Sequence, residues 1–254
     1  LSLEEFEPPQ PSANQVLIKV TASCVNYADT IMIQGHYQTR PDFPFAPGLE
    51  AAGEVIQCGS AVSRFKPGDR VMALLGFGGF AEQAIANETD CFHVPAEMDD
   101  ETAAAFLIGY ISSHVAIRWQ AKLEAGETML VLGASGGVGL TAVEIGKALG
   151  ASVIAGASSA EKLEIARQRG ADQLIDYKRN SLKKSVAELT NGEGADVCYD
   201  PVGGDLFDEA LSSLAWGGRI LVIGFVGGIP KIPANRLLVK HRSAMGSSLR
   251  YFRE

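Results

Sequence analysis

Apolar residues in the first hundred positions recur at short intervals, a pattern that predicts β-strands. Within residues 16–20, valine or isoleucine stands at every second position, as expected for a half-buried strand. Residues 65–71 predict a tight turn leading into another strand, because the proline fixes φ and the next glycine allows a positive φ. One short helix is expected over residues 27–34, and Gly35 is placed to end it in the left-handed conformation.

From residue 99 onward the chain changes to short apolar runs separated by helical segments. Asp99 and Asp100 are placed to cap one long helix that runs through Thr102 to about Ala121. Strands are then expected at residues 129–132, 152–157, 173–175, 197–199 and 219–223, with one helix from the glycine-rich turn to Leu149 and another over 160–169. Short, wholly apolar strands alternating with helices are typical of a parallel sheet covered on both faces. The sequence therefore predicts an α/β protein, with a mostly β domain over 1–98 and a doubly wound domain over 99–254.

Composition and charge narrow the class of protein further. The 254 residues include 46% hydrophobic and 20% charged residues, which is typical of a globular protein. Thirty acidic against 22 basic residues give a formal charge of −8, which argues against nucleic acid or an anionic membrane as a partner. The four cysteines are scattered without a CxxC pair, so we expect a reducing, cytoplasmic environment and no cysteine-rich zinc site.

The segment 133–139, GASGGVG, is the most informative one in the chain. It follows an expected strand and opens an expected helix, where backbone N–H groups can face a pyrophosphate. A glycine string alone also occurs in flexible loops, but the complete βαβ unit around this one favours a dinucleotide site. Against the pattern G-x-G-x-x-G, an alanine takes the first glycine position. The candidate cofactor-binding residues are Ala134, Ser135, Gly136, Gly137, Val138 and Gly139.

The end of the second strand of this unit bears on which dinucleotide binds. NAD sites carry a carboxylate there, but this chain has Ser158 and Ser159, with Lys162 one helical turn later. A carboxylate would repel a 2′-phosphate by about 1 to 4 kcal/mol at 4 Å, depending on the dielectric. The pattern therefore favours NADPH, bound through Ser158 and Lys162. In the alternative interpretation, Ser158 only caps the next helix and Lys162 is a solvated surface charge.

Five segments together carry a family resemblance that extends over nearly the whole chain. They are residues 25–30 (VNYADT), 47–53 (PGLEAAG), 65–71 (FKPGDRV), 133–139 (GASGGVG) and 200–204 (DPVGG). In this order they resemble the medium-chain dehydrogenase/reductase superfamily, and more closely its zinc-free, zeta-crystallin-like quinone oxidoreductase branch. The resemblance implies a GroES-like catalytic domain followed by a Rossmann domain, and a homodimer. It also implies a strand before Leu1, and a sixth Rossmann strand and a completing segment after Glu254.

The same resemblance implies that the protein holds no catalytic zinc. Zinc-dependent relatives place a cysteine at the position of Asn26 and a histidine at the position of Leu49. Neither side chain present here is a zinc ligand. Without a metal Lewis acid, hydride transfer suits an acceptor that is already electrophilic. We therefore expect a quinone or an α,β-unsaturated carbonyl as substrate.

Three candidate catalytic residues, Asn26, Asp29 and Tyr37, are implied by the family pattern. Asn26 and Asp29 would order the nicotinamide ribose and the substrate, although Asp29 can equally cap or pair within the first domain. Tyr37 would donate to a quinone oxygen, or else packs in the core. Relatives often carry a tyrosine where this chain has Ile31, which leaves the proton donor open.

The remaining candidate residues would contact the cofactor. Ser112 corresponds to a family hydroxyl near the nicotinamide, or else bonds the preceding helical turn. Tyr177 resembles the residue that packs beside the 2′-phosphate. The backbone of Gly224, Phe225 and Val226 resembles the loop that holds the nicotinamide amide. Together the pattern predicts an NADPH-dependent reductase; an enoyl-thioester reductase and an NADPH-binding protein without turnover, as among the crystallin relatives, are the alternatives.

Overall fold

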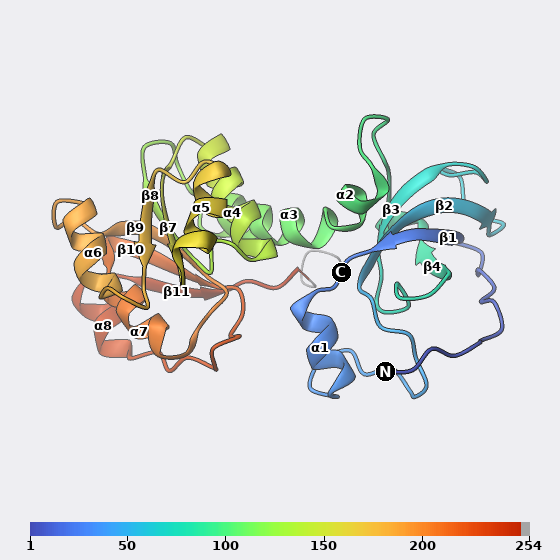
Figure 1. Ribbon diagram of the computed structural model, residues 1–254, viewed down its shortest axis with the longest axis horizontal. Helices are drawn as coiled ribbons and strands as arrows, with labels where there is room; N and C mark the ends of the chain where they lie inside the picture. The colour runs from blue at the N-terminus through green and yellow to red at the C-terminus, as the bar shows by residue number, and fades with distance from the viewer. Residues whose placement is uncertain (250–254) are drawn as a thin grey trace. The chain divides into compact units, whose positions relative to one another are not determined.

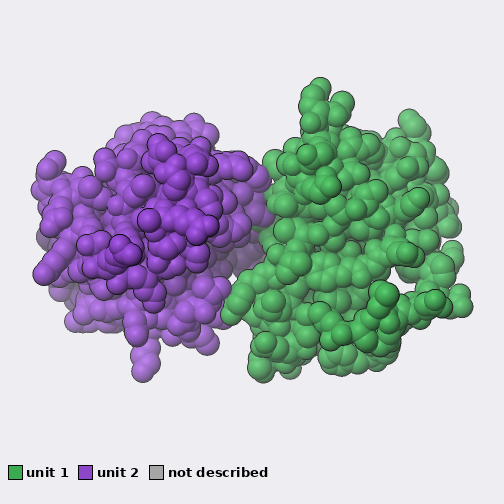
Figure 2. All heavy atoms as spheres, viewed as in Figure 1, with its two compact units in different colours: residues 1–108 green, residues 109–254 purple. Residues whose placement is uncertain are grey.

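The computed structural model describes residues 1–249 and divides into two compact units (Figures 1 and 2). Unit 1 comprises Leu1–Ile108 and unit 2 comprises Gly109–Glu254. Within the described range, no helix is long and apolar enough to cross a membrane.

Unit 1 is built on a five-stranded antiparallel sheet with the strand order β4-β1-β2-β3-β5. Its strands are β1 (Gln15–Ser23), β2 (Glu50–Cys58), β3 (Arg70–Leu74), β4 (Gln83–Asn87) and β5 (Cys91–His93), with a 3₁₀ turn over Glu88–Asp90. The alternation predicted for β1 holds only in part: Val16 and Ile18 are fully buried in the core of this sheet and Val20 packs against it, but Leu17 is also buried. Gly53 permits the close pairing of β1 and β2, since a Cβ there would lie 2.1 Å from the Lys19 carbonyl oxygen.

The short helix and the tight turn predicted in unit 1 are both present. Helix α1 (Tyr27–Ile33) is followed by Gly35 with φ of +73°. In the turn before β3, Gly68 has φ of +94° and the Asp69 N–H donates to the Lys66 carbonyl at 3.1 Å. The mostly β architecture expected for this half of the chain is therefore confirmed.

The prediction of a single long helix through Thr102 to about Ala121 is wrong, because the structure has three helical pieces there. They are α2 (Asp100–Ala104), α3 (Leu107–His114) and a π-helical segment, η2 (Val115–Gln120). Asp99 does cap α2, and its side chain accepts from the Thr102 N–H at 2.7 Å. The backbone tightens after Ala104, and the Ile108 N–H donates to the Glu50 carboxylate at 2.9 Å. This bond to a side chain from β2 starts α3 as a separate helix.

Unit 2 contains a six-stranded parallel sheet with the strand order β11-β10-β9-β6-β7-β8. The strands are β6 (Thr128–Leu132), β7 (Ser152–Ala157), β8 (Gln173–Asp176), β9 (Ala195–Asp200), β10 (Leu214–Val222) and β11 (Ser243–Gly246). The helices are α4 (Gly137–Ala148), α5 (Ala160–Gln168), α6 (Leu182–Leu189), α7 (Gly204–Ser212) and α8 (Ala234–Val239). The chain order reverses between β6 and β9, so the topological switch point of the sheet lies between these two strands.

Each face of this sheet is buried by its own group of helices. Met129 and Val131 of β6 pack in a core with residues of η2, α4 and α5. Leu130 and Leu132, which point the other way, pack in a second core with residues of α6 and α7. Because successive strand residues face opposite sides, an uninterrupted apolar strand is what a sheet covered on both faces requires. The predicted doubly wound domain is confirmed.

The sixth strand of the sheet does not lie after Glu254, where we expected it. It is β11, which pairs with β10 in parallel from Arg219 opposite Ser243 to Val222 opposite Gly246. Only two of its four residues, Ala244 and Met245, are apolar, so it carries no periodic signal. Its position at the edge of the sheet explains this composition, since an edge strand is only partly covered.

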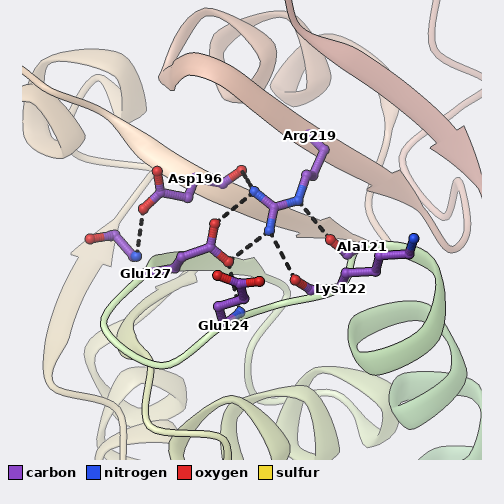
Figure 3. A network of polar contacts seen from close by, with 7 residues as sticks. Ala121, Lys122, Glu124, Glu127, Asp196 and Arg219 are labelled. Atoms are coloured by element: carbon purple, nitrogen blue, oxygen red, sulfur yellow. Dashed lines mark hydrogen bonds and ion pairs between the residues drawn. The ribbon is translucent and has the colours of Figure 1, made fainter.

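Arg219, within β10, joins this strand to the loop before β6 (Figure 3). Its guanidinium donates to both carboxylate oxygens of Glu127 at 2.7 and 2.9 Å, and to the carbonyl oxygens of Ala121, Lys122 and Asp196. The Asp196 carboxylate accepts from the Thr128 N–H at 2.8 Å. These bonds hold together the N-terminal ends of β6 and β9 and the adjoining part of β10. The loops described in the next section follow the opposite, C-terminal ends of the strands.

Candidate functional site

The glycine-rich turn, residues 133–139, connects β6 to α4 and will be called the phosphate turn. Gly136 is the N-cap of α4, so no side chain caps the first N–H groups of this twelve-residue helix. Gly139 lies so close to the start of the turn that a Cβ there would be 2.2 Å from the Gly133 oxygen. Gly136 and Gly137 are exposed, whereas Ala134 is buried and its N–H donates to the Gly156 oxygen of β7 at 3.1 Å. An exposed, uncapped helix N-terminus of this kind fits a phosphate group.

The predicted residues Ser158, Lys162 and Tyr177 lie close together at the ends of β7 and β8. Lys162 Nζ donates to Ser158 Oγ at 3.3 Å, and the Ser158 hydroxyl lies near enough to the Tyr177 phenol to influence its pKa. Burial raises the pKa of Tyr177 above its ordinary value. The cap of α5 is Ser159, whose side chain accepts from the Lys162 N–H at 3.4 Å. The alternative role for Ser158 as that cap is therefore wrong.

Two further loops extend from the neighbouring strands of the same sheet. The Asp200 turn, residues 200–204, follows β9, and the glycine loop, residues 224–228, follows β10. The Gly227 N–H donates to the Val202 oxygen at 2.8 Å, and the Gly204 N–H donates to the Gly228 oxygen at 2.8 Å. The glycine loop contains the three predicted residues Gly224, Phe225 and Val226, and the last two are exposed.

Helix α3 presents two serines with different surroundings. The predicted cofactor residue, Ser112, is half-buried, whereas Ser113 is fully buried. Ser113 Oγ lies 2.9 Å from the Tyr199 hydroxyl of β9 and 2.8 Å from Thr141 Oγ1 of α4. Thr141 in turn donates to the Gly109 oxygen at 3.0 Å. No sequence pattern indicates this buried network, which joins α3 to the first turns of α4.

In unit 1, two buried carboxyl groups surround the start of α1. Both oxygens of Asp29 accept backbone N–H groups, from Asn26 at 2.8 Å and from Gly48 at 3.0 Å. Asp29 therefore joins α1 to the loop before β2, as one of our two interpretations anticipated. Glu50 accepts from Asn26 Nδ2 and from the Ile108 N–H, each at 2.9 Å. This residue was not among the predicted ones, although it belongs to the segment that replaces the zinc motif.

Burial dominates the electrostatics of this cluster. Both Asp29 and Glu50 are 1% exposed, and burial raises the pKa of each carboxyl above its ordinary value. The hydrogen bonds from amide groups oppose this shift, since they stabilise the ionised form. Burial, followed by the negative charge of Glu50, also raises the pKa of the nearby Cys24 thiol. Cys24 is thus held as a thiol rather than as a reactive thiolate.

Tyr37, the third predicted catalytic residue, lies in the loop after α1. It is half-buried, and its carbonyl oxygen accepts from Arg40 Nε at 3.3 Å. Across residues 1–249, no group of three or more histidine, cysteine, aspartate or glutamate side chains is arranged to hold a metal ion. The side chains of Asn26 and Leu49 do not fit the zinc site of the zinc-dependent dehydrogenases, because an amide and an alkyl group are not zinc ligands.

Comparison with known proteins places these features in a family. The profile of the alcohol dehydrogenase GroES-like domain matches residues 12–96, and that of the zinc-binding dehydrogenase family matches residues 137–254. Quinone oxidoreductase-like protein 2 of Bos taurus is 42% identical over 248 residues, which cover 97% of this chain and 71% of the relative.

Two solved structures resemble this fold closely. The Escherichia coli quinone oxidoreductase complexed with NADPH superposes with a TM-score of 0.91 at 31% identity, over 98% of this chain and 77% of that one. The CurK enoyl reductase superposes with a TM-score of 0.88 at 25% identity, over 98% of this chain and 77% of that one. The chain belongs to the quinone oxidoreductase-like branch of the medium-chain dehydrogenase/reductase family.

Proposed function

We propose that this chain is an NADPH-dependent reductase that transfers hydride to a quinone or an α,β-unsaturated carbonyl without zinc. The observation that carries the proposal is the uncapped glycine N-terminus of α4, which stands at the edge of the sheet that also bears the Ser158–Lys162 pair. The E. coli relative crystallised with NADPH supports the choice of cofactor.

The proposed binding residues divide between the two ends of the cofactor. Within the phosphate turn, Ala134 to Gly139 would hold the pyrophosphate through the free N–H groups at the start of α4. Ser158, Lys162 and Tyr177 would receive the 2′-phosphate, because two hydroxyls and a cation meet there. The exposed glycine loop would hold the nicotinamide amide, with Ser112 of α3 as a further contact.

NADPH supplies the hydride of this reaction when it is bound. The chain contributes a polar group, the Asn26 amide, whose orientation is set by its bond to Glu50 at 2.9 Å. One Nδ2 hydrogen is used by that bond, and the second would donate to the acceptor oxygen as negative charge develops on it. A placed donor of this kind contributes about 2.7 to 4 kcal/mol to transition-state stabilisation. Asp29 would hold Asn26 at the start of α1, and Tyr37 is a second proposed donor.

A single set of assays tests this function. NADPH consumption is measured with a quinone, a 2-alkenal and an enoyl thioester, each repeated with NADH and after incubation with zinc and with a chelator. We expect turnover of the quinone or the alkenal, a preference for NADPH and no response to zinc or chelator. Preferential turnover of the enoyl thioester would favour the activity named for the CurK relative. Binding of NADPH without turnover of any acceptor would favour a crystallin-like binding role.

We also propose that the protein is a cytoplasmic homodimer. Three large apolar side chains near the edge of the unit 2 sheet support self-association: Trp216 is 72% exposed, Leu238 83% and Val239 68%. Sedimentation equilibrium should give about twice the chain mass of 26.9 kDa, and a monomeric mass at micromolar concentration would refute the dimer. Imaging of a tagged chain tests the compartment.

A further inference from the structure

Three loops follow adjacent parallel strands of the unit 2 sheet, so all three lie at the C-terminal ends of these strands. The phosphate turn follows β6, the Asp200 turn follows β9, and the glycine loop follows β10. Since β6 and β9 flank the switch point, the Asp200 turn lies where ligands bind in open α/β sheets. It is also the middle of the three loops, and it contacts both of its neighbours.

On one side the Asp200 turn packs against the phosphate turn. A Cβ on Gly133 would lie 3.2 Å from Val202 Cγ2 and 3.5 Å from Pro201 Cγ, so these side chains cover the first glycine of the phosphate turn. Gly133 has φ of +57° and leaves room for that contact.

On the other side the Asp200 turn is bonded to the glycine loop along its length. Besides the two bonds already given, the Ile223 N–H donates to the Asp200 oxygen at 2.9 Å and the Val226 N–H to the Pro201 oxygen at 3.5 Å. A Cβ on Gly203 would be 2.6 Å from the Gly228 oxygen, and one on Gly204 would be 2.4 Å from the Gly227 oxygen. The two loops are therefore in direct backbone contact, and the position of one determines the position of the other.

The conformation of the Asp200 turn is set by the Asp200 side chain. Its Oδ1 accepts from the Val202 N–H at 2.7 Å and from the Gly203 N–H at 2.9 Å. The residue is fully buried, and Oδ2 has no hydrogen-bond partner within residues 1–249. Burial raises the pKa of this carboxyl, against the opposing effect of the two amide bonds. A buried carboxyl oxygen without a partner costs stability, so folding alone does not account for an aspartate here.

We propose that Asp200 is a positioning residue for the nicotinamide half of the cofactor. It holds the Asp200 turn, and the Asp200 turn holds the glycine loop in place beside the phosphate turn. The inference rests on the proposed function, because it takes the glycine loop as the site of the nicotinamide amide. It predicts that loss of Asp200 weakens contacts to the nicotinamide while contacts to the adenosine half persist.

The test compares two ligands on each variant of the full chain. NADPH carries the nicotinamide, whereas 2′,5′-ADP carries only the phosphorylated adenosine half. We expect D200A to weaken NADPH by about tenfold or more, equivalent to about 1.4 kcal/mol, and to change 2′,5′-ADP by less than about twofold. D200N keeps an oxygen acceptor for the two amides and should recover most of the NADPH affinity. Kd values from calorimetry give the ratio of the two affinities for each variant.

A matched control comes from the other end of the same strand. Asp196 also accepts a backbone N–H, that of Thr128, but at the edge away from the loops. D196A should lower thermal stability without changing the ratio of the two affinities. Should D200A fail to fold, G227A perturbs the same interface from the opposite loop, because its Cβ would lie 3.2 Å from the Val202 oxygen. G227A should then show the same selective loss of NADPH.

The outcomes separate this inference from the proposed function. Selective loss of NADPH in D200A or G227A supports the role of Asp200. Equal loss of both ligands, or no loss of either, overturns it while leaving the cofactor assignment intact. Wild-type protein that binds neither ligand overturns the proposed function and this inference together.

Discussion

Replacing Glu50 by glutamine should separate the fold of unit 1 from the chemistry proposed for Asn26. Glu50 is a pure acceptor toward two donors, Asn26 Nδ2 and the Ile108 N–H. Glutamine has nearly the same shape but offers one acceptor and one donor. The Ile108 N–H is backbone and can only donate, so it keeps the glutamine oxygen. The glutamine NH2 then faces Asn26, and this contact is favourable only if the Asn26 amide rotates by half a turn.

The rotated amide presents its oxygen to the introduced glutamine and changes which atoms remain available to a substrate. Stability should fall by only about 1 kcal/mol, because both charge-assisted bonds become neutral ones while the cost of burying a charge is removed. The proposed donor to the acceptor oxygen, in contrast, is misdirected. Removing one such donor costs about 2.7 to 4 kcal/mol, which corresponds to a loss of about 10² to 10³ in kcat.

The assay measures thermal stability, kcat and the KM for NADPH on wild type, E50Q and E50A. E50A leaves two buried donors without an acceptor, at about 1 to 3 kcal/mol each. Its Tm should therefore drop by at least about 4 °C, given about 2 to 4 °C per kcal/mol for a chain of this size. E50Q should keep its Tm within a few degrees and lose kcat. An E50Q variant that keeps wild-type kcat would refute the orienting role of Glu50, and an E50A variant with an unchanged Tm would refute the structural one.

Three further predictions concern unit 2. R219M removes the paired bonds to Glu127. Because both side chains of this ion pair are about a quarter exposed or less, its loss should destabilise the fold by about 2 to 3 kcal/mol in thermal or urea unfolding. Burial alone would raise the pKa of Glu127, but its bonds to Arg219 and to an amide outweigh burial and lower this pKa. The stabilisation is therefore present above the ordinary pKa of 4.5 and is lost as pH falls through the lowered value. The difference in stability between wild type and R219M should narrow on acidification, and a constant difference would contradict this. G139A should lower Tm and NADPH affinity because its Cβ would meet the Gly133 oxygen at 2.2 Å, whereas G137A, with open space around its Cβ, should leave Tm unchanged. K162A should reduce the preference for NADPH over NADH by about five- to tenfold, as one cation near a phosphate is worth about 1 kcal/mol in exposed surroundings; an unchanged ratio would remove Lys162 from the site.

The sequence predicts those parts of unit 2 whose signals are local. The phosphate turn lies between an apolar strand and a helix, and each of the three is recognisable from its own residues. Gly150 and Gly170 end α4 and α5 with φ of +83° and +105°, as their positions after the last helical turn indicate. Strand β11, in contrast, exists because its backbone pairs with β10, and its composition alone is indistinguishable from that of a loop.

The break between α2 and α3 shows how a distant residue overrides local propensity. Residues 103–105 are alanines, the best helix formers, so the sequence favours an uninterrupted helix. The break is specified by Glu50, which lies 58 positions from Ile108 in the chain and accepts a hydrogen bond from the Ile108 N–H. Likewise, Asp200 was recognised as part of a family segment, but its role depends on a loop more than twenty residues further on. Neither partnership leaves a pattern in a single sequence.

The assignment of the cap of α5 has a consequence for the choice of cofactor. Sequence alone allows either Ser158 or Ser159 to cap this helix, and it leaves Lys162 as a surface charge if Ser158 does so. Ser159 has the extended backbone that an N-cap needs, with φ of −161° and ψ of 159°, and its oxygen accepts the Lys162 N–H. Ser158 does not cap the helix, and its hydroxyl accepts from the Lys162 ammonium at 3.3 Å beside the Tyr177 phenol. The negative charges of Asp176 and Asp200 act on the Tyr177 phenol, but the end of β7 itself carries hydroxyls and a cation rather than a carboxylate. An added phosphate would therefore gain hydrogen bonds and the attraction of Lys162 there, which is the physical basis for expecting NADPH rather than NADH.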